Sequence, residues 1–281
     1  MKKLMTSVLV VTVAVILSFV LGIGSPAAAA PATVEEAGFL SAPWKFHVNL
    51  YGWLPDAPAE IRVDGKKVVD VPEDVDTILD SLQRAGMFEL EVHKGPLIFF
   101  ANNVYYKGKY DKNFKGPVTG LPKEYTLQEE VWVIKYGAGY ELGPWNLGKS
   151  DDSPTWNLIP WVGAFYFHDS WKLKIEDRDG SNADKVNGTY KFNTPMVGLG
   201  ARPKLSERWY LNLSYGYGGW DVDHVEYVHD FIGNVSYRFN MWNVSSKVFA
   251  GYRYLHFERK EQKKEIDLKA YGPFFGIGWE F

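Results

Sequence analysis

The chain has 281 residues, no cysteine, 16% aromatic residues and a formal net charge of −3 at pH 7. The acidic balance and the lack of a basic patch exclude nucleic acid as a partner. The absence of cysteine fits an oxidising envelope compartment, where disulfides are optional. The aromatic excess is typical of proteins that place Trp and Tyr at two membrane interfaces.

The N-terminus predicts a cleaved secretory signal peptide over residues 1–32. Lys2 and Lys3 precede an apolar run over residues 4–22, and small residues follow from Ser25 to Ala30. This order is typical of a signal peptide, and we expect cleavage between residues 27 and 32. An uncleaved anchor helix is the alternative, because the run approaches spanning length. Residues 33–43 are then a short periplasmic tail.

Period-two alternation predicts a series of strands after this tail. In the first, over residues 44–54, Lys45 and His47 share one face. In the second, over residues 87–93, Glu89, Glu91 and His93 share a face that must point away from lipid. Further strands are predicted over residues 97–107, 127–142, 156–175, 189–205, 209–218, 227–241, 244–257 and 266–281.

This order predicts an all-β fold, a closed antiparallel transmembrane β-barrel over residues 44–281. Long and short connections alternate, as expected for long extracellular loops and short periplasmic turns. We expect ten strands. Eight or twelve remain open, because the strand 97–107 and the connection 143–154 have weak patterns.

An insert over residues 55–86 separates the first two strands. Asp64-Gly65 predicts a hairpin turn. Beyond Pro72, the apolar face formed by Val75, Ile78 and Leu82 predicts a short helix. This face must be covered. The helix is either part of an extracellular cap folded on its own hairpin or a plug in the barrel mouth.

Several runs resemble a family of uncharacterised bacterial outer-membrane barrel proteins, in the style of the small OmpA- and OmpW-like barrels. They are Tyr51–Pro55, residues 70–71, residues 76–82, residues 88–91 and the C-terminal strand. The resemblance implies the barrel fold and no particular chemistry.

The C-terminal strand carries the clearest pattern in the chain. Phe275, Ile277, Trp279 and Phe281 alternate with smaller or polar residues. Outer-membrane barrels resemble one another in ending on Phe, which implies an assembly signal for the barrel-assembly machinery. The predicted location is the bacterial outer membrane. Expected partners are outer-membrane lipid, that machinery, periplasmic chaperones and small solutes.

Inward-facing ionisable side chains are predicted to form one lumen network. Its members are Lys45, His47, Glu89, Glu91, His93, Lys135, Glu141, Arg238, Arg253 and Glu280. Since the first strand must pair with both the second and the last, we expect Lys45 between Glu91 and Glu280. The network either fills a narrow barrel or lines a pore and sets its selectivity.

Two short segments suggest hydrolase chemistry. Asp221, Asp223 and His224, with His229 and Asp230 nearby, faintly resemble the acidic and Asp-His groups of omptin proteases. A second acidic pair that would activate water is missing.

The other segment, His168-Asp169-Ser170, resembles the His-x-Ser of outer-membrane lipid A deacylases, in which the imidazole activates the hydroxyl. Which face of the strand points outward is ambiguous, because Phe165 and Phe167 compete with Ala164 and Tyr166.

No cofactor or metal site is predicted, because the histidines are dispersed along the sequence and no His-Glu-x-x-His motif occurs. The predicted function is a non-catalytic structural protein or small-solute channel. The alternative is a hydrolase at the extracellular rim. An adhesin acting through the loops 108–125 and 176–187 is a third hypothesis.

Overall fold

The computed structural model describes residues 42–63, 66–71, 74–115, 122–146, 154–177, 183–241, 243–262 and 264–281. The predicted signal peptide and nearly all of the predicted tail lie outside these residues. Among the residues that are described, no helix is long and apolar enough to cross a membrane.

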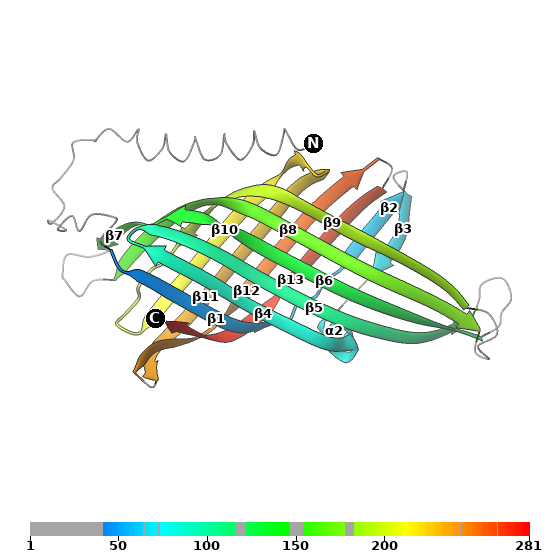
Figure 1. Ribbon diagram of the computed structural model, residues 1–281, viewed down its shortest axis with the longest axis horizontal. Helices are drawn as coiled ribbons and strands as arrows, with labels where there is room; N and C mark the ends of the chain where they lie inside the picture. The colour runs from blue at the N-terminus through cyan, green and yellow to red at the C-terminus, as the bar shows by residue number, and fades with distance from the viewer. Residues whose placement is uncertain are drawn as a thin grey trace. The chain divides into compact units, whose positions relative to one another are not determined.

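Ten strands of the described chain form the barrel wall. They are β1 (Trp44–Trp53), β4 (Leu82–Lys94), β5 (Leu97–Lys115), β6 (Pro122–Tyr140), β8 (Thr155–Asp177), β9 (Ala183–Ala201), β10 (Trp209–Val222), β11 (Val225–Met241), β12 (Val244–Glu261) and β13 (Lys264–Glu280). Each pairs with the next in antiparallel fashion, and β1 closes the barrel against β13 (Figure 1). In this closing pair His47 lies opposite Glu280. The prediction of a closed ten-stranded barrel is confirmed.

A short strand, β7 (Leu142–Asn146), explains the weak connection between the fourth and fifth predicted strands. It pairs with the start of β8, with Leu142 opposite Leu158 and Asn146 opposite Thr155. Part of the predicted connection 143–154 is therefore a strand that pairs with β8, at the same end of the barrel as the short turns.

The insert contains the predicted hairpin, β2 (Ala59–Val63) and β3 (Lys66–Val71), and the predicted helix, α2 (Val75–Ser81). The hairpin is not self-contained: β2 pairs with the first residues of β13, where β1 has already left the wall. The helix begins at an Asp74 cap, whose carboxylate accepts the Thr77 N–H at 2.8 Å. Asp56 accepts the Val75 N–H at 3.0 Å and so ties the helix to the end of β1.

Large apolar side chains cover the outside of the wall. The exposed ones include Phe46, Leu50, Leu90, Phe99, Tyr136, Val197, Leu199, Leu213, Tyr215, Phe231, Val235, Val248, Tyr252 and Phe275. A band of this kind around a closed barrel is the surface that lipid covers. The protein is therefore an outer-membrane β-barrel.

The short turns identify the periplasmic end. β4 and β5 are joined through Gly95-Pro96, and β11 and β12 through residues 242–243. Phe281 lies at this end, where its backbone pairs with Phe46. β8 has 23 residues, about twice the 9–11 that cross a membrane, so its far half extends toward the extracellular side.

The face of β8 that was ambiguous from sequence is settled by burial. Phe165 is fully buried and Phe167 is 6% exposed, both within the barrel core. Ala164 and Tyr166 therefore face outward. Two phenyl rings inside a lumen reverse the usual rule for barrels, whose interiors are polar.

Candidate functional site: two chambers in the barrel lumen

A polar chamber of about 460 Å³ occupies the periplasmic half of the lumen. All ten side chains of the predicted lumen network line it, so alternation along the strands found the correct face. Sequence reasoning missed Arg202, Lys204 and Lys247, which also line it. Arg202 and Lys204 lie between β9 and β10, in a segment whose pattern suggested a strand end.

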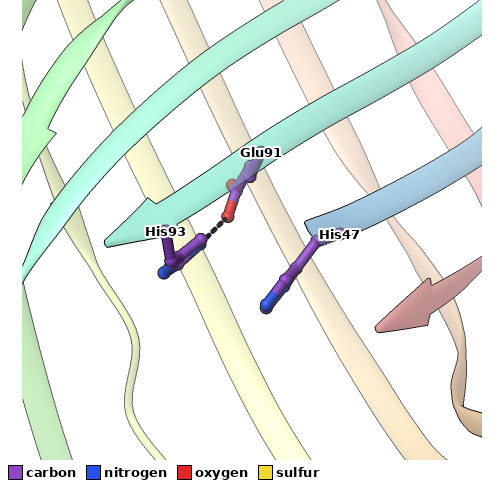
Figure 2. Close-up of side chains that lie close together, drawn as sticks. All are labelled: His47, Glu91 and His93. Atoms are coloured by element: carbon purple, nitrogen blue, oxygen red, sulfur yellow. Dashed lines mark hydrogen bonds and ion pairs between the residues drawn. The ribbon is translucent and has the colours of Figure 1, made fainter. Parts of the chain in front are cut away.

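His47, Glu91 and His93 form a cluster on the wall of the polar chamber. They project from β1 and β4 toward the same space (Figure 2). The two imidazole rings stack with centroids 4.4 Å apart and an interplanar angle of 11°. Nε2 of His93 lies 2.9 Å from Glu91 Oε2. The interpretation of the histidines as dispersed is therefore wrong for this pair.

The barrel register places His47, not Lys45, between Glu91 and Glu280. Lys45 lies opposite His93, two residues nearer the periplasmic end. The prediction identified the right neighbouring strands but not the stagger between them. That stagger is fixed by the backbone ladder of the closed barrel and leaves no signature in the alternation of one strand.

The cluster is partly neutralised by cations. The other Glu91 oxygen accepts a hydrogen bond from Arg202 at 2.5 Å. His47 Nε2 lies 3.7 Å from Glu280 and has no hydrogen-bond partner among the described residues. One ligand atom from each of His47, Glu91 and His93 lies within 4.8 Å of the others, close enough to hold a metal ion. Arg202 would compete with that ion for Glu91.

A layer of buried polar side chains closes the inner end of the polar chamber. We call Lys135, Asp230, Arg253, Asn102 and Tyr51 the septum. Arg253 Nε donates to one Asp230 oxygen at 2.9 Å, and Lys135 Nζ lies 2.6 Å from the other. Asp230 is fully buried, and Arg253 is 2% exposed.

Hydrogen bonds through Asn102 link Arg253 to a second carboxylate. Asn102 accepts from Arg253 at 3.2 Å and from Tyr51 at 3.0 Å, and it donates to Glu89 at 3.1 Å. Arg253 is thereby connected to two carboxylates, directly to Asp230 and through Asn102 to Glu89. A buried ion network of this kind is held together only when all its members are present.

An apolar chamber of about 470 Å³ lies on the extracellular side of the septum. On β6 and β12 the boundary falls within two residues: Val133 lines the apolar chamber and Lys135 the polar one, and the same change separates Leu255 from Arg253. Phe167 and Phe257 pack with ring centroids 4.8 Å apart. An aromatic lumen is unusual for this class of barrel.

The helix α2 borders the mouth of the apolar chamber. Its apolar residues Val75, Ile78 and Leu79 line the chamber. Ser81 joins it to the wall through a 2.6 Å contact with the Tyr106 hydroxyl. The prediction of a cap folded on its own hairpin is therefore wrong, because β2 pairs with β13 and the apolar face of the helix lines the chamber instead.

The residues grouped as omptin-like do not form one site. Asp223 and His224 make the tight β10–β11 turn with positive φ angles of 54° and 64°. Asp223 accepts the Asn193 N–H at 3.0 Å. Asp230 belongs to the septum, and His229 stacks among outward aromatic rings, 5.1 Å from Tyr217. The predicted proximity of Asp230 to the rim is therefore wrong.

The His168-Asp169-Ser170 segment is split by the pleat of β8. His168 and Ser170 face outward, and Asp169 lines the apolar chamber. Nδ1 of His168 and Oδ1 of Asp169 have no hydrogen-bond partner among the described residues. Asp169 lies on the opposite side of the wall and does not orient the imidazole. Glu130, opposite Ser170, pairs with Lys107 at 3.4 Å.

Known proteins resemble the chain only distantly. No family model matches the chain, and no curated protein matches it. The outer-membrane protease OmpT of Escherichia coli is 12% identical with a TM-score of 0.49, over 85% of this chain and 96% of that one.

Two further solved structures are more distant. The attachment invasion locus protein Ail of Yersinia pestis is 10% identical, with a TM-score of 0.31 over 85% and 99% of the two chains. The toluene transporter TodX of Pseudomonas putida is 10% identical, with a TM-score of 0.31 over 85% and 90%. Similarity at this level carries no functional argument.

Proposed function

We propose that the protein is a non-catalytic conduit for small solutes in the outer membrane, held closed at rest by the septum. One observation supports this proposal above the others: two chambers of similar volume lie in one lumen and are separated by buried side chains, among them Lys135 and Arg253. A barrel whose interior served only as a core would be packed along its length.

The ionic character of the septum suits a closed gate. Lys135, Asp230 and Arg253 depend on one another for charge compensation, so their contacts are made or lost together. Neither hydrolase candidate supports catalysis, because neither brings a nucleophile, a base and an orienting acid to one point.

Conductance in planar bilayers tests the conduit. The protein is purified from outer membranes as wild type, as a Lys135→Ala, Asp230→Ala, Arg253→Ala triple variant, and as a variant lacking residues 57–84. The triple substitution removes the two cations of the septum together with the carboxylate that they share, so none of these three charges is left buried without its partner. We expect a silent wild type and steady conductance from the triple variant.

The deletion variant distinguishes a barrier formed by the septum from a barrier formed by the insert. If the septum is the barrier, the deletion variant stays silent, because Lys135, Asp230 and Arg253 remain in place. Conductance from the deletion alone would instead make the insert the plug. A Glu226→Ala, Lys260→Ala double variant at the rim is the matched control and should remain silent. A folded but silent triple variant would contradict the conduit and leave a structural barrel.

A further inference from the structure

We propose that the apolar chamber is a binding site for a small neutral molecule with an apolar ring-sized body and one hydrogen-bond donor. The inference rests on the proposed function, since it names the class of solute that would enter the conduit from outside. It is carried by the size, the lining and one unsatisfied oxygen of the chamber.

The size of the chamber fits a small molecule. Its volume of about 470 Å³ lies within the range of roughly 300–1,000 Å³ that is common for small-molecule sites. Barrel strands surround it, the septum closes its inner end, and α2 borders its mouth. A folded partner protein has no room there.

The lining selects a neutral, apolar body. Trp53, Phe167, Phe192, Leu255 and Phe257 line the chamber, and each is less than 10% exposed. Phe192 meets Phe257 edge to face with ring centroids 5.1 Å apart. Aromatic rings arranged in this way favour a further flat apolar body. Arg259 also lines the chamber, but its guanidinium already pairs with Glu261 at 2.8 Å, so an anionic ligand would lose its hydration and have to compete for this cation.

Asp169 supplies the polar contact. It lines the chamber, and its Oδ1 is buried without a hydrogen-bond partner among the described residues; rotation of the carboxylate about its soft terminal torsion would turn this oxygen toward a ligand. A buried acceptor without a hydrogen bond raises the free energy of the folded protein, so a ligand that donates to it gains binding free energy. A ligand hydroxyl is such a donor, whereas a ligand carboxylate would be repelled. The chemistry therefore favours a phenol-like molecule over its carboxylate analogue.

Thiol protection tests the site, and the absence of cysteine from the chain makes single labels clean. Leu255→Cys reports on the apolar chamber and Asn234→Cys on the polar chamber. Each full-length protein, in lipid nanodiscs open to buffer at both ends, is treated with the small neutral reagent methyl methanethiosulfonate. The reaction rate is measured alone, with 2-naphthol, and with 2-naphthoate.

We expect 2-naphthol at about ten times its dissociation constant to slow modification of Leu255→Cys about tenfold and to leave Asn234→Cys unchanged. The anionic 2-naphthoate should protect neither. Addition of Ala270→Trp, which fills the chamber from a buried wall position, should abolish saturable protection. Ala250→Trp on the exposed outer face of β12 is the matched control and should preserve it.

Three results would overturn the site: no protection by 2-naphthol, equal slowing at both cysteines, or an unreactive Leu255→Cys in the absence of ligand. The last would mean that the chain itself fills the chamber. Binding and passage are distinguishable. If 2-naphthol protects Leu255→Cys but the septum triple variant does not conduct, the binding site stands and the proposed conduit is contradicted. If the triple variant conducts but 2-naphthol gives no protection, the conduit stands and the binding site is contradicted.

Discussion

The two chambers share most of their strands yet have opposite chemistry. On β12, Lys247 and Arg253 serve the polar chamber, and Leu255 and Phe257 serve the apolar one. The outer face of the same strand is apolar at Val248 and Tyr252. Lipid therefore imposes one rule on the outside, while the inside changes with depth.

The difference teaches how a narrow barrel can fill its interior in two ways. The polar half is stabilised by ion pairs such as Glu91 with Arg202, which satisfy the charges that they bury. The apolar half is stabilised by removal of rings from water. The septum lies at the junction, where the Arg253 guanidinium sits over the Trp53 ring at 4.9 Å.

The largest expected effect on stability comes from a substitution in the septum, where the two chambers meet. Asp230→Asn keeps the shape of the side chain but leaves Lys135 and Arg253 buried without their shared carboxylate. We expect a loss of about 3–5 kcal/mol in unfolding free energy, measured by urea unfolding of the barrel in detergent. The triple variant Lys135→Met, Asp230→Leu, Arg253→Met should recover most of it. A single-variant cost below about 1 kcal/mol would show that the charges are solvated.

A smaller effect sharpens the contrast between the chambers. Leu255→Asn places an amide among apolar walls and removes a buried side chain, so we expect a loss of about 2–4 kcal/mol. The opposite exchange in the polar chamber, Asn234→Leu, removes one 3.0 Å hydrogen bond from Asn212 and should cost about 1 kcal/mol. Both are read from the same urea transition. Equal costs would contradict the distinction between the chambers.

The cap of the apolar chamber is expected to respond more weakly. Asp74→Ala removes the hydrogen bond to the Thr77 N–H and should destabilise α2 by about 1 kcal/mol. Hydrogen exchange of residues 75–81 should quicken, while exchange in the wall strands stays unchanged. Asp80→Ala, at the other end of the helix, is the control. Unchanged exchange in Asp74→Ala would show that the helix is held by packing alone.

The smallest effect lies at the extracellular rim, beyond the apolar outer band. Hydrogen bonds to Glu258 and Glu226 raise the pKa of Lys260. Burial alone would raise the pKa of Glu258, but hydrogen bonds from Lys260 and Tyr227 hold it below its ordinary value. Lys260→Met should cost less than about 1 kcal/mol at pH 7, because the pairs are exposed.

The pH dependence of this rim effect follows from the two shifts. The lowered Glu258 pKa stabilises the fold above the ordinary value of about 4.3, and this contribution is lost as pH falls through the folded value. The raised Lys260 pKa stabilises it below about 10.4, and this contribution is lost as pH rises through the folded value. The difference between wild type and Lys260→Met should therefore shrink at pH 3. A larger difference there would contradict the assignment.

The fold and the polar face could be predicted because alternation reports which side of a strand faces lipid. Lys135 and Arg253 were assigned to the lumen on that basis, and they lie there. The same pattern failed on β8, where Phe165 is as apolar as an outward residue yet fills the lumen. Alternation assumes a polar interior, so an apolar chamber is invisible to it.

The position of a residue along the barrel axis and the register between strands also could not be predicted from the sequence. Asp230 follows His229 in a segment that suggested the rim, but the strand carries it inward to the septum. His47, rather than Lys45, meets Glu91 and Glu280, because ring closure sets the stagger. Both errors concern position along the barrel axis, for which a period of two holds no information.

The β2–β3 hairpin has a consequence for solubility during assembly. β13 pairs with β1 only from Phe274 to Glu280, and its first residues would otherwise present unpaired N–H and C=O groups along one side. β2 occupies that side from Lys264 to Leu268. The free edge is thereby transferred to β3, a strand of six residues, and short edges are poor templates for the strand-to-strand growth that leads to aggregation.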